Sequence, residues 1–192
     1  MGRGRTAETI LNATIRLFLE TGAKKTTMDD IAERAAVSKV TVYKYFADKD
    51  ALYEQAGKQL MAGFLNRVDA VVSSESELPR KLAEMIDCVT EFTDSGRYEL
   101  CCELARYNEA TGGEFLRFKE GYRSAMMALI DEGLEHGMFR EGLDRDMVFY
   151  YVDMGVSYYQ LNRQYRGRMT ADAGFRERYM GFLLSGLFAK AN

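Results

Sequence analysis

The sequence predicts an all-α fold, and three observations support this class. Apolar residues recur at the spacing of amphipathic helices, and the sustained period-two alternation of a half-buried strand occurs nowhere. The 192 residues include one proline, which suits a mostly helical chain because prolines inside helices are costly. A composition of 47% hydrophobic and 29% charged residues is that of a globular protein with a buried core.

The first quarter of the chain is expected to hold short helices joined by tight turns. The first helix covers about residues 6–21, where an apolar stripe faces inward and Gly22 supplies a stop. Thr27, with an aspartate three residues later, resembles a capping box at the start of a second, short helix. Ser38 is a good N-cap for a third short helix, and Asp48 caps a fourth. The second and third helices, with their tight turn, fit a helix-turn-helix unit.

Longer helices are expected in the rest of the chain. Their predicted ranges are 49–72, 79–94, 97–110, 113–136, 144–166 and 171–190. The glycine pair at 112–113 and the segment from Gly137 to Gly142 are interpreted as breaks, because glycine is unfavourable inside a helix.

The third helix presents an outer face that suits the major groove of DNA. On a helical wheel Val42 and Phe46 point toward the other helices, and the opposite face carries Val40, Thr41 and Lys44, flanked by Tyr43 and Tyr45. Lys39 lies at the exposed first turn. Lys44 can donate to guanine O6 and N7, and Val40 can contact a thymine methyl group. The hydroxyls of the threonine and the two tyrosines suit phosphate oxygens. The plainer alternative is a solvated helix face with exposed tyrosines.

Charge is distributed unevenly along the chain. Residues 1–50 carry nine Lys/Arg against seven Asp/Glu, a net charge of +2, so the remainder carries −5 of the total −3. A mildly basic N-terminal region on an acidic remainder is compatible with DNA binding by that region alone.

The segment that carries these features resembles a known family. Residues 26–52, TTMDDIAERAAVSKVTVYKYFADKDAL, are similar to the N-terminal domain of TetR-type regulators, the tetracycline-repressor family. The resemblance implies a DNA-binding head, residues 1–47, and a helical ligand-binding and dimerisation body, residues 48–192. It also implies DNA contacts by Thr27, Ser38, Lys39, Thr41, Tyr43, Tyr45 and Lys49. The chain departs from the family at Ala36 and Val40, where glycine is common, so the operator sequence does not carry over.

The helix expected at 144–166 has two apolar stripes, and a helix apolar on two sides must bury both. One stripe contains Met147, Tyr151, Met154, Tyr158 and Leu161, and the other contains Val148, Val152, Gly155 and Tyr159. We expect a two-fold homodimer in which this helix and the last one pair with their symmetry mates. The predicted interface comprises Val152, Gly155, Tyr159, Tyr179, Phe182, Leu183 and Gly186. The alternative is that both stripes serve one monomeric core.

Methionine and aromatic side chains line three helix faces of the body that can enclose a cavity. The predicted ligand pocket comprises Met85, Cys88, Phe92, Phe118, Tyr122, Met126, Tyr151, Met154 and Tyr158. Flexible thioethers with a few tyrosine hydroxyls favour an apolar or aromatic effector over a phosphorylated one. The alternative is a fully packed core.

The sequence offers no basis for an enzyme. The single histidine, His136, is interpreted as complementing a helix dipole, and neither zinc-ligand spacing nor a phosphate-binding loop is found, so no metal or cofactor is expected. Cys88, Cys101 and Cys102 are interpreted as small apolar residues, with a thiol sensor as the alternative. We found no signal peptide and no membrane span, which predicts a cytoplasmic protein.

These observations predict a ligand-responsive, sequence-specific transcriptional regulator, a repressor that binds a near-palindromic double-stranded DNA operator as a homodimer. A helical partner-binding module whose head no longer binds DNA is the alternative from another class. A small metabolic enzyme that uses the pocket of the body is the third possibility, and turnover of the ligand would distinguish it.

Overall fold

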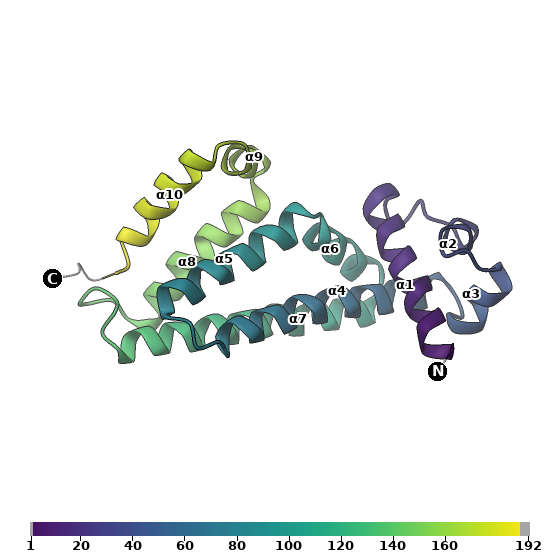
Figure 1. Ribbon diagram of the computed structural model, residues 1–192, viewed down its shortest axis with the longest axis horizontal. Coiled ribbons are helices and arrows are strands. Elements are labelled where there is room, and N and C mark those ends of the chain that lie inside the picture. Colours follow the sequence, from purple (N-terminus) through teal and green to yellow (C-terminus); the bar gives the residue numbers. More distant parts are fainter. Residues whose placement is uncertain (1, 189–192) are drawn as a thin grey trace. The chain divides into compact units, whose positions relative to one another are not determined.

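The computed structural model describes residues 2–188, with side chains from residue 4 onward, and this part of the chain is helical throughout (Figure 1). Its helices are α1 (Gly2–Thr21), α2 (Met28–Arg34), α3 (Lys39–Tyr45), α4 (Lys49–Val72), α5 (Leu78–Asp94), α6 (Arg97–Tyr107), α7 (Glu109–Glu135), α8 (Arg145–Leu161), α9 (Arg163–Ala171) and α10 (Ala173–Ser185). Phe139 and Phe188 form one isolated antiparallel bridge, and no strand occurs within residues 2–188. The predicted all-α class is confirmed.

The described residues form two compact units. One comprises residues 2–67 and 92–121, and the other comprises residues 68–91 and 122–188. The head, predicted as residues 1–47, is therefore part of a larger unit that also holds most of α4, all of α6 and the start of α7. The predicted boundary between a DNA-binding head and a ligand-binding body at residue 47 lies inside one compact unit, and it stays a prediction.

The head is built around a small apolar core. Its buried members are Ile10, Ala13, Leu17, Ile31, Ala32, Ala35, Val42, Phe46 and Leu52, which come from α1, α2, α3 and the start of α4. Gly22 ends α1 with a φ of 90°, in the left-handed region that glycine adopts easily. This core fixes the orientation of the short α3.

The same unit contains a cluster of phenylalanine rings. The Phe64 ring lies 4.8 Å from that of Phe92 and 5.2 Å from that of Phe118, and Phe115 stacks on Phe118 at 5.7 Å. Centroid separations of this size are those of favourable aromatic pairs. The cluster joins α4 to the ends of α5 and α7 that belong to this unit.

The second unit is held together by buried apolar contacts, by an ion pair, and by hydrogen bonds near its C-terminal end. Lys81 of α5, a buried lysine, pairs with Glu132 of α7 at 3.0 Å. Arg140 donates to the carbonyl oxygens of Ser185 and Phe188, at 2.7 and 3.3 Å. The Tyr151 hydroxyl of α8 donates to the Leu183 carbonyl oxygen at 2.9 Å. These bonds attach the end of α10 to α8 and to the loop after α7.

Two predicted helix boundaries were wrong for the same reason. The glycine pair at 112–113 does not break a helix, because α7 begins at Glu109 and continues through both glycines. The helix expected over 144–166 is two helices, α8 and α9, divided at Asn162. Asn162 ends α8, and its side chain accepts from the Tyr165 amide at 2.8 Å to start α9. Asn108 has the same double role between α6 and α7. A side-chain cap decided both boundaries.

Two glycines of α7 predict opposite effects of the same substitution. A Cβ at buried Gly133 would overlap the Phe139 ring and Leu78, whereas a Cβ at Gly113 would meet open space. We therefore expect Gly133→Ala to lower the free energy of unfolding by about 1–3 kcal/mol, the usual cost of overpacking. Gly113→Ala should raise it by about 0.5–1 kcal/mol, because alanine favours the helix. Urea denaturation followed by circular dichroism measures both, and equal shifts for the two variants would contradict this packing.

Candidate nucleic-acid interface

Helices α2 and α3 are placed by side-chain caps that the sequence predicted. Thr27 caps α2 in a capping box: its hydroxyl accepts from the Asp30 amide at 3.2 Å, and Asp30 accepts from the Thr27 amide at 2.7 Å. Ser38 caps α3 by accepting from the Thr41 amide at 3.1 Å. Asp48 accepts from the Ala51 amide at 2.8 Å at the start of α4. The starts of α2, α3 and α4 are thus each fixed by one polar side chain.

The turn between α2 and α3 contains a strained alanine. Ala36 has a φ of 53°, the only positive φ of a non-glycine residue in the described part of the chain. In this left-handed region the Cβ of an L-residue is crowded, and glycine is the usual occupant. The Val37 amide donates to the Ala32 carbonyl oxygen at 3.0 Å, which closes the turn. The turn therefore keeps its helix-turn-helix shape although it lacks a glycine.

One face of α3 is buried and the other is open. Val42 is fully buried and Phe46 nearly so, both in the head core. Val40 is 79% exposed, Tyr43 is 46% exposed and Lys44 is also exposed. A valine that exposed on a seven-residue helix gains nothing for folding, because its apolar surface remains in water. This face is suited to base edges in a major groove.

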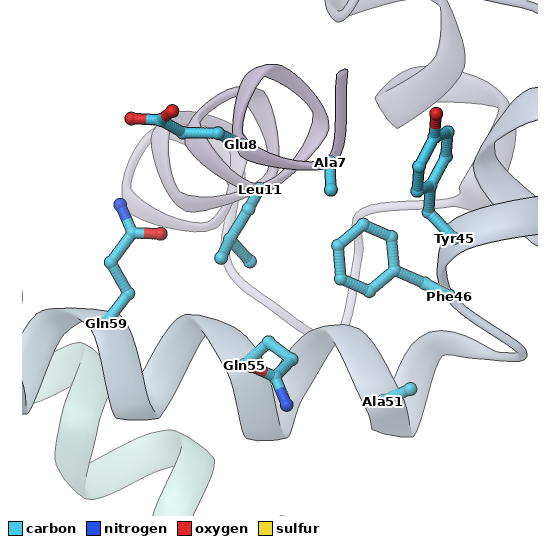
Figure 2. Close-up of a pocket in the computed structure, with 8 residues that line it drawn as sticks. All are labelled: Ala7, Glu8, Leu11, Tyr45, Phe46, Ala51, Gln55 and Gln59. Carbon is cyan, nitrogen blue, oxygen red and sulfur yellow. The ribbon is translucent and has the colours of Figure 1, made fainter. Parts of the chain in front are cut away.

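Tyr45 lies differently from its neighbours. It is half-buried, packs against the head core, and lines a surface pocket of about 350 Å³ formed by α1, α3 and α4. Figure 2 shows Leu11 of α1 and Phe46 on either side of this space, with Gln55 of α4 beneath. The Tyr45 ring therefore has a packing role besides the phosphate contact predicted for its hydroxyl.

The candidate phosphate-binding cations differ in how they are held. The Lys39 ammonium pairs with Asp29 of α2 at 2.9 Å, and this hydrogen bond raises the pKa of Lys39. Lys49 donates to the Lys24 carbonyl oxygen at 3.0 Å, and burial lowers its pKa. Lys44 makes no ion pair with any residue that the structure describes. Asp29 was not identified from the sequence, because a pair ten residues apart across a turn has no local signal.

The small hydroxyls predicted to contact DNA are engaged within the head. The Thr27 hydroxyl donates to Asp30 at 2.8 Å while it caps α2. The hydroxyls of Ser38 and Thr41 lie 2.8 Å apart. A hydroxyl has one proton and two lone pairs, so these groups can reorient toward a phosphate with little rearrangement.

The comparisons with known proteins agree with this geometry. Residues 10–56 match the family model described as bacterial regulatory proteins, tetR family. The chain is 31% identical over 149 residues to the uncharacterized HTH-type transcriptional regulator YdeS of Bacillus subtilis, covering 72% of this chain and 70% of that protein.

The chain belongs to the TetR family of transcriptional regulators. The fatty acid metabolism regulator protein of Bacillus subtilis is 26% identical over 163 residues, or 81% of this chain and 84% of that protein. The solved structure of the ketosteroid transcriptional regulator KstR2 of Mycobacterium tuberculosis has a TM-score of 0.66 and 20% identity, over 99% of this chain and 98% of that one. As a TetR-family member the chain is a DNA-binding regulator and not an enzyme, which sets aside both alternatives.

The predicted pocket residues of this TetR-family chain fall into three exposure classes. Met85, Cys88, Phe92, Phe118 and Met126 are buried, Tyr122 and Tyr151 are half-buried, and Met154 and Tyr158 are exposed. Phe92 and Phe118 belong to the phenylalanine cluster of the first unit, and the other seven belong to the second unit. Burial raises the pKa of Tyr122, and Asp153 and Cys88 nearby raise it further. Helices α5, α7 and α8 thus approach one another around Tyr122.

The predicted interface residues are mostly half-buried. Tyr159 is buried, Val152, Gly155, Tyr179 and Leu183 are half-buried, and Phe182 and Gly186 are exposed. On α8 the large exposed side chains are instead Met147, Tyr150, Met154, Tyr158 and Leu161, of which all but Tyr150 belong to the stripe that also contains half-buried Tyr151. Exposure therefore favours these five side chains, and not the predicted interface residues of α8, as the surface open to a partner.

The cysteines and the acidic groups suggest no further chemistry. Burial raises the pKa of Cys101 to about 12, and Cys88 is also buried, which favours structural roles over redox sensing. Within residues 2–188 no His, Cys, Asp and Glu side chains gather as a possible metal site. None of the helices in that range combines the length and apolarity needed to cross a membrane.

The Lys39–Asp29 pair predicts a variant with tighter DNA binding. Asp29 competes with a phosphate for Lys39, so Asp29→Asn should raise the affinity for any duplex about two- to fivefold, as expected for releasing an exposed ion pair. Fluorescence anisotropy with an arbitrary duplex, titrated at several salt concentrations, measures this gain. Glu33→Gln is the matched control, because it removes the same charge from α2 without touching Lys39. An equal gain in both variants would mean that net charge alone is responsible.

Proposed function

We propose that the chain is a ligand-responsive repressor that binds a near-palindromic operator as a homodimer. The observation that carries the proposal is the outer face of α3, where Val40, Tyr43 and Lys44 are exposed while the opposite face is buried in the head core. A two-fold dimer presents two such helices to two half-sites. Occupying the operator needs no further contact with the transcription machinery, so repression is the simplest outcome.

An apolar effector is the second part of the proposal. Met85, Cys88 and Met126 are buried in the unit that also holds half-buried Tyr122, and side chains of this kind suit an apolar molecule oriented by a hydroxyl. The names of two similar proteins, a fatty acid metabolism regulator and a ketosteroid regulator, point to the same chemical class. By linkage, an effector that releases DNA must prefer the protein conformation that binds the operator poorly.

Base reading and phosphate binding by α3 predict different mutant signatures. An operator selected from a random duplex library supplies the specific probe. On it, Lys44→Ala should cost about 1–3 kcal/mol and relax the preference at one position of each half-site. Tyr43→Phe should weaken binding to all sequences alike, because a phosphate contact carries no sequence information. Repeating the selection with each variant distinguishes the two, and an unchanged operator affinity in both would contradict the assignment of α3.

The effector proposal predicts that filling the interior of the body abolishes the response. A panel of fatty acids and sterols is screened for compounds that raise the melting temperature and release operator DNA. Met126→Trp should remove both effects while leaving DNA binding intact, because the indole occupies the space around buried Met126. Leu116→Trp is the control, since Leu116 lies on the same helix and is 70% exposed. Release by polar compounds alone, or an unchanged response in Met126→Trp, would contradict an apolar site.

A further inference from the structure

The surface pocket beside Tyr45 is a second place where a small molecule can bind, apart from the effector site proposed above. Its volume is about 350 Å³, and its lining comes from residues 7–11 of α1, 45–46 at the end of α3 and 51–59 of α4. All of these residues belong to the first compact unit, whereas the proposed effector site lies in the second. Small-molecule sites have volumes of about 300–1,000 Å³, so the pocket is large enough for a small ligand.

The middle of the pocket is apolar. Leu11 and Phe46 lie on either side of the space, and the short side chains of Ala7 and Ala51 leave it open (Figure 2). Phe46 is buried, and the other three residues are half-buried. A flat apolar group placed between Leu11 and Phe46 would therefore be removed from water on both of its faces, which is favourable.

One edge of the pocket carries hydrogen-bond acceptors. Glu8 of α1 and Gln59 of α4 lie together at this edge, away from Tyr45 (Figure 2). The Gln59 amide nitrogen donates to the Asn12 side-chain oxygen at 2.8 Å, so the Gln59 carbonyl oxygen remains as an acceptor. Glu8 is exposed, and its carboxylate pairs with no basic side chain in the described part of the chain.

These acceptors favour a cation over an anion or a neutral molecule. Glu8 is the one charged side chain in the described lining of the pocket, and no lysine or arginine lies among the lining residues. An ammonium group has three donors and no acceptor, so it can bond to the Glu8 carboxylate and to the Gln59 carbonyl oxygen together. The apolar middle and the acidic edge are thus complementary to an amphipathic amine.

We propose that this pocket binds a small amphipathic amine, with its ammonium group at Glu8 and Gln59 and its apolar part between Leu11 and Phe46. The amine contacts α1, α3 and α4 at once, so it binds best when α3 lies where the structure places it. Helix α3 has seven residues and depends on tertiary contacts for its position. The bound amine therefore favours the arrangement that displays the outer face of α3, and acts as a corepressor. The corepressor role rests on the proposed function, whereas the binding does not.

Three compounds with the same indole ring test the chemistry of the pocket. At neutral pH tryptamine carries an ammonium group, tryptophol a hydroxyl and indole-3-propionate a carboxylate. In ligand-observed NMR titrations of the whole chain, tryptamine should bind about two- to fivefold more tightly than tryptophol, as expected for an exposed ion pair. Indole-3-propionate should bind more weakly than both, because Glu8 repels it. Equal affinities for the three compounds would overturn the acidic edge.

Variants of α1 locate the binding site. Glu8→Gln should reduce the affinity for tryptamine to that for tryptophol, whereas Glu33→Gln, which removes the same charge from α2, should keep the difference. Ala7→Trp should abolish binding of both compounds in the pocket, because the indole fills it. Thr9→Trp is the matched control, since Thr9 is exposed on α1 and does not line the pocket. Unchanged binding of tryptamine in both Glu8→Gln and Ala7→Trp would refute this site.

DNA binding in the presence of the amine tests the corepressor role. Saturating tryptamine should lower the Kd of the wild-type chain for the selected operator about fivefold, at the lower end of usual allosteric couplings. Fluorescence anisotropy measures the change at constant ionic strength, with tryptamine and DNA alone as the control. The gain should be lost in Ala7→Trp and kept in Thr9→Trp. An operator affinity that tryptamine leaves unchanged or weakens would overturn the corepressor role. A chain that binds tryptamine but no operator would refute the proposed function and leave the pocket as an amine site.

Discussion

The burial of Val42 and Phe46 in the head core is the interaction on which the candidate DNA interface depends. Helix α3 has only seven residues, too few to be stable without tertiary contacts. Its orientation therefore comes from these two side chains, which pack against residues of α1 and α2 such as Ile10 and Ile31. Once they are buried, helical geometry turns Val40, Tyr43 and Lys44 outward. The apolar contacts that fold the head thus also display the side chains that we propose read DNA.

Local patterns in the sequence predicted the head well and the later helices less well. The caps at Thr27, Ser38 and Asp48 formed as predicted, because each depends on residues no more than three positions apart. Gly22 ended its helix, but the glycines at 112–113 did not, since the conformational cost of glycine is small against the packing of a long helix. The asparagines that do divide helices, Asn108 and Asn162, were missed, although asparagine favours helix ends over helix interiors.

Local patterns could not predict the partner of Lys39, nor which stripe of α8 is buried and which is exposed. Asp29 and Lys39 lie ten residues apart and meet only because the α2–α3 turn folds back. Both stripes of α8 are apolar, so the sequence alone indicated that each should be buried. It did not indicate which stripe packs within the chain and which stays exposed. Tyr159 is buried against Tyr165 of α9, at 6.1 Å between rings, and this contact arises because Asn162 breaks the helix. Because the boundary at Asn162 was missed, the sequence analysis could not predict which stripe of α8 is buried.

The intramolecular partners of Lys39 and Lys49 suggest why a second head would be needed for tight DNA binding in the proposed homodimer. Lys39 is paired with Asp29 and Lys49 is bonded to a backbone carbonyl, so each already has a partner within the chain that competes with a phosphate. The affinity of one head for DNA is reduced by this competition. Two heads linked in a dimer recover affinity, because binding of the first raises the effective concentration of the second near its half-site. Weak single heads with a firmly paired body also favour discrimination, since a lone half-site holds the protein poorly. In the proposed homodimer, the engaged lysines of the head would therefore make tight binding depend on a site with two half-sites.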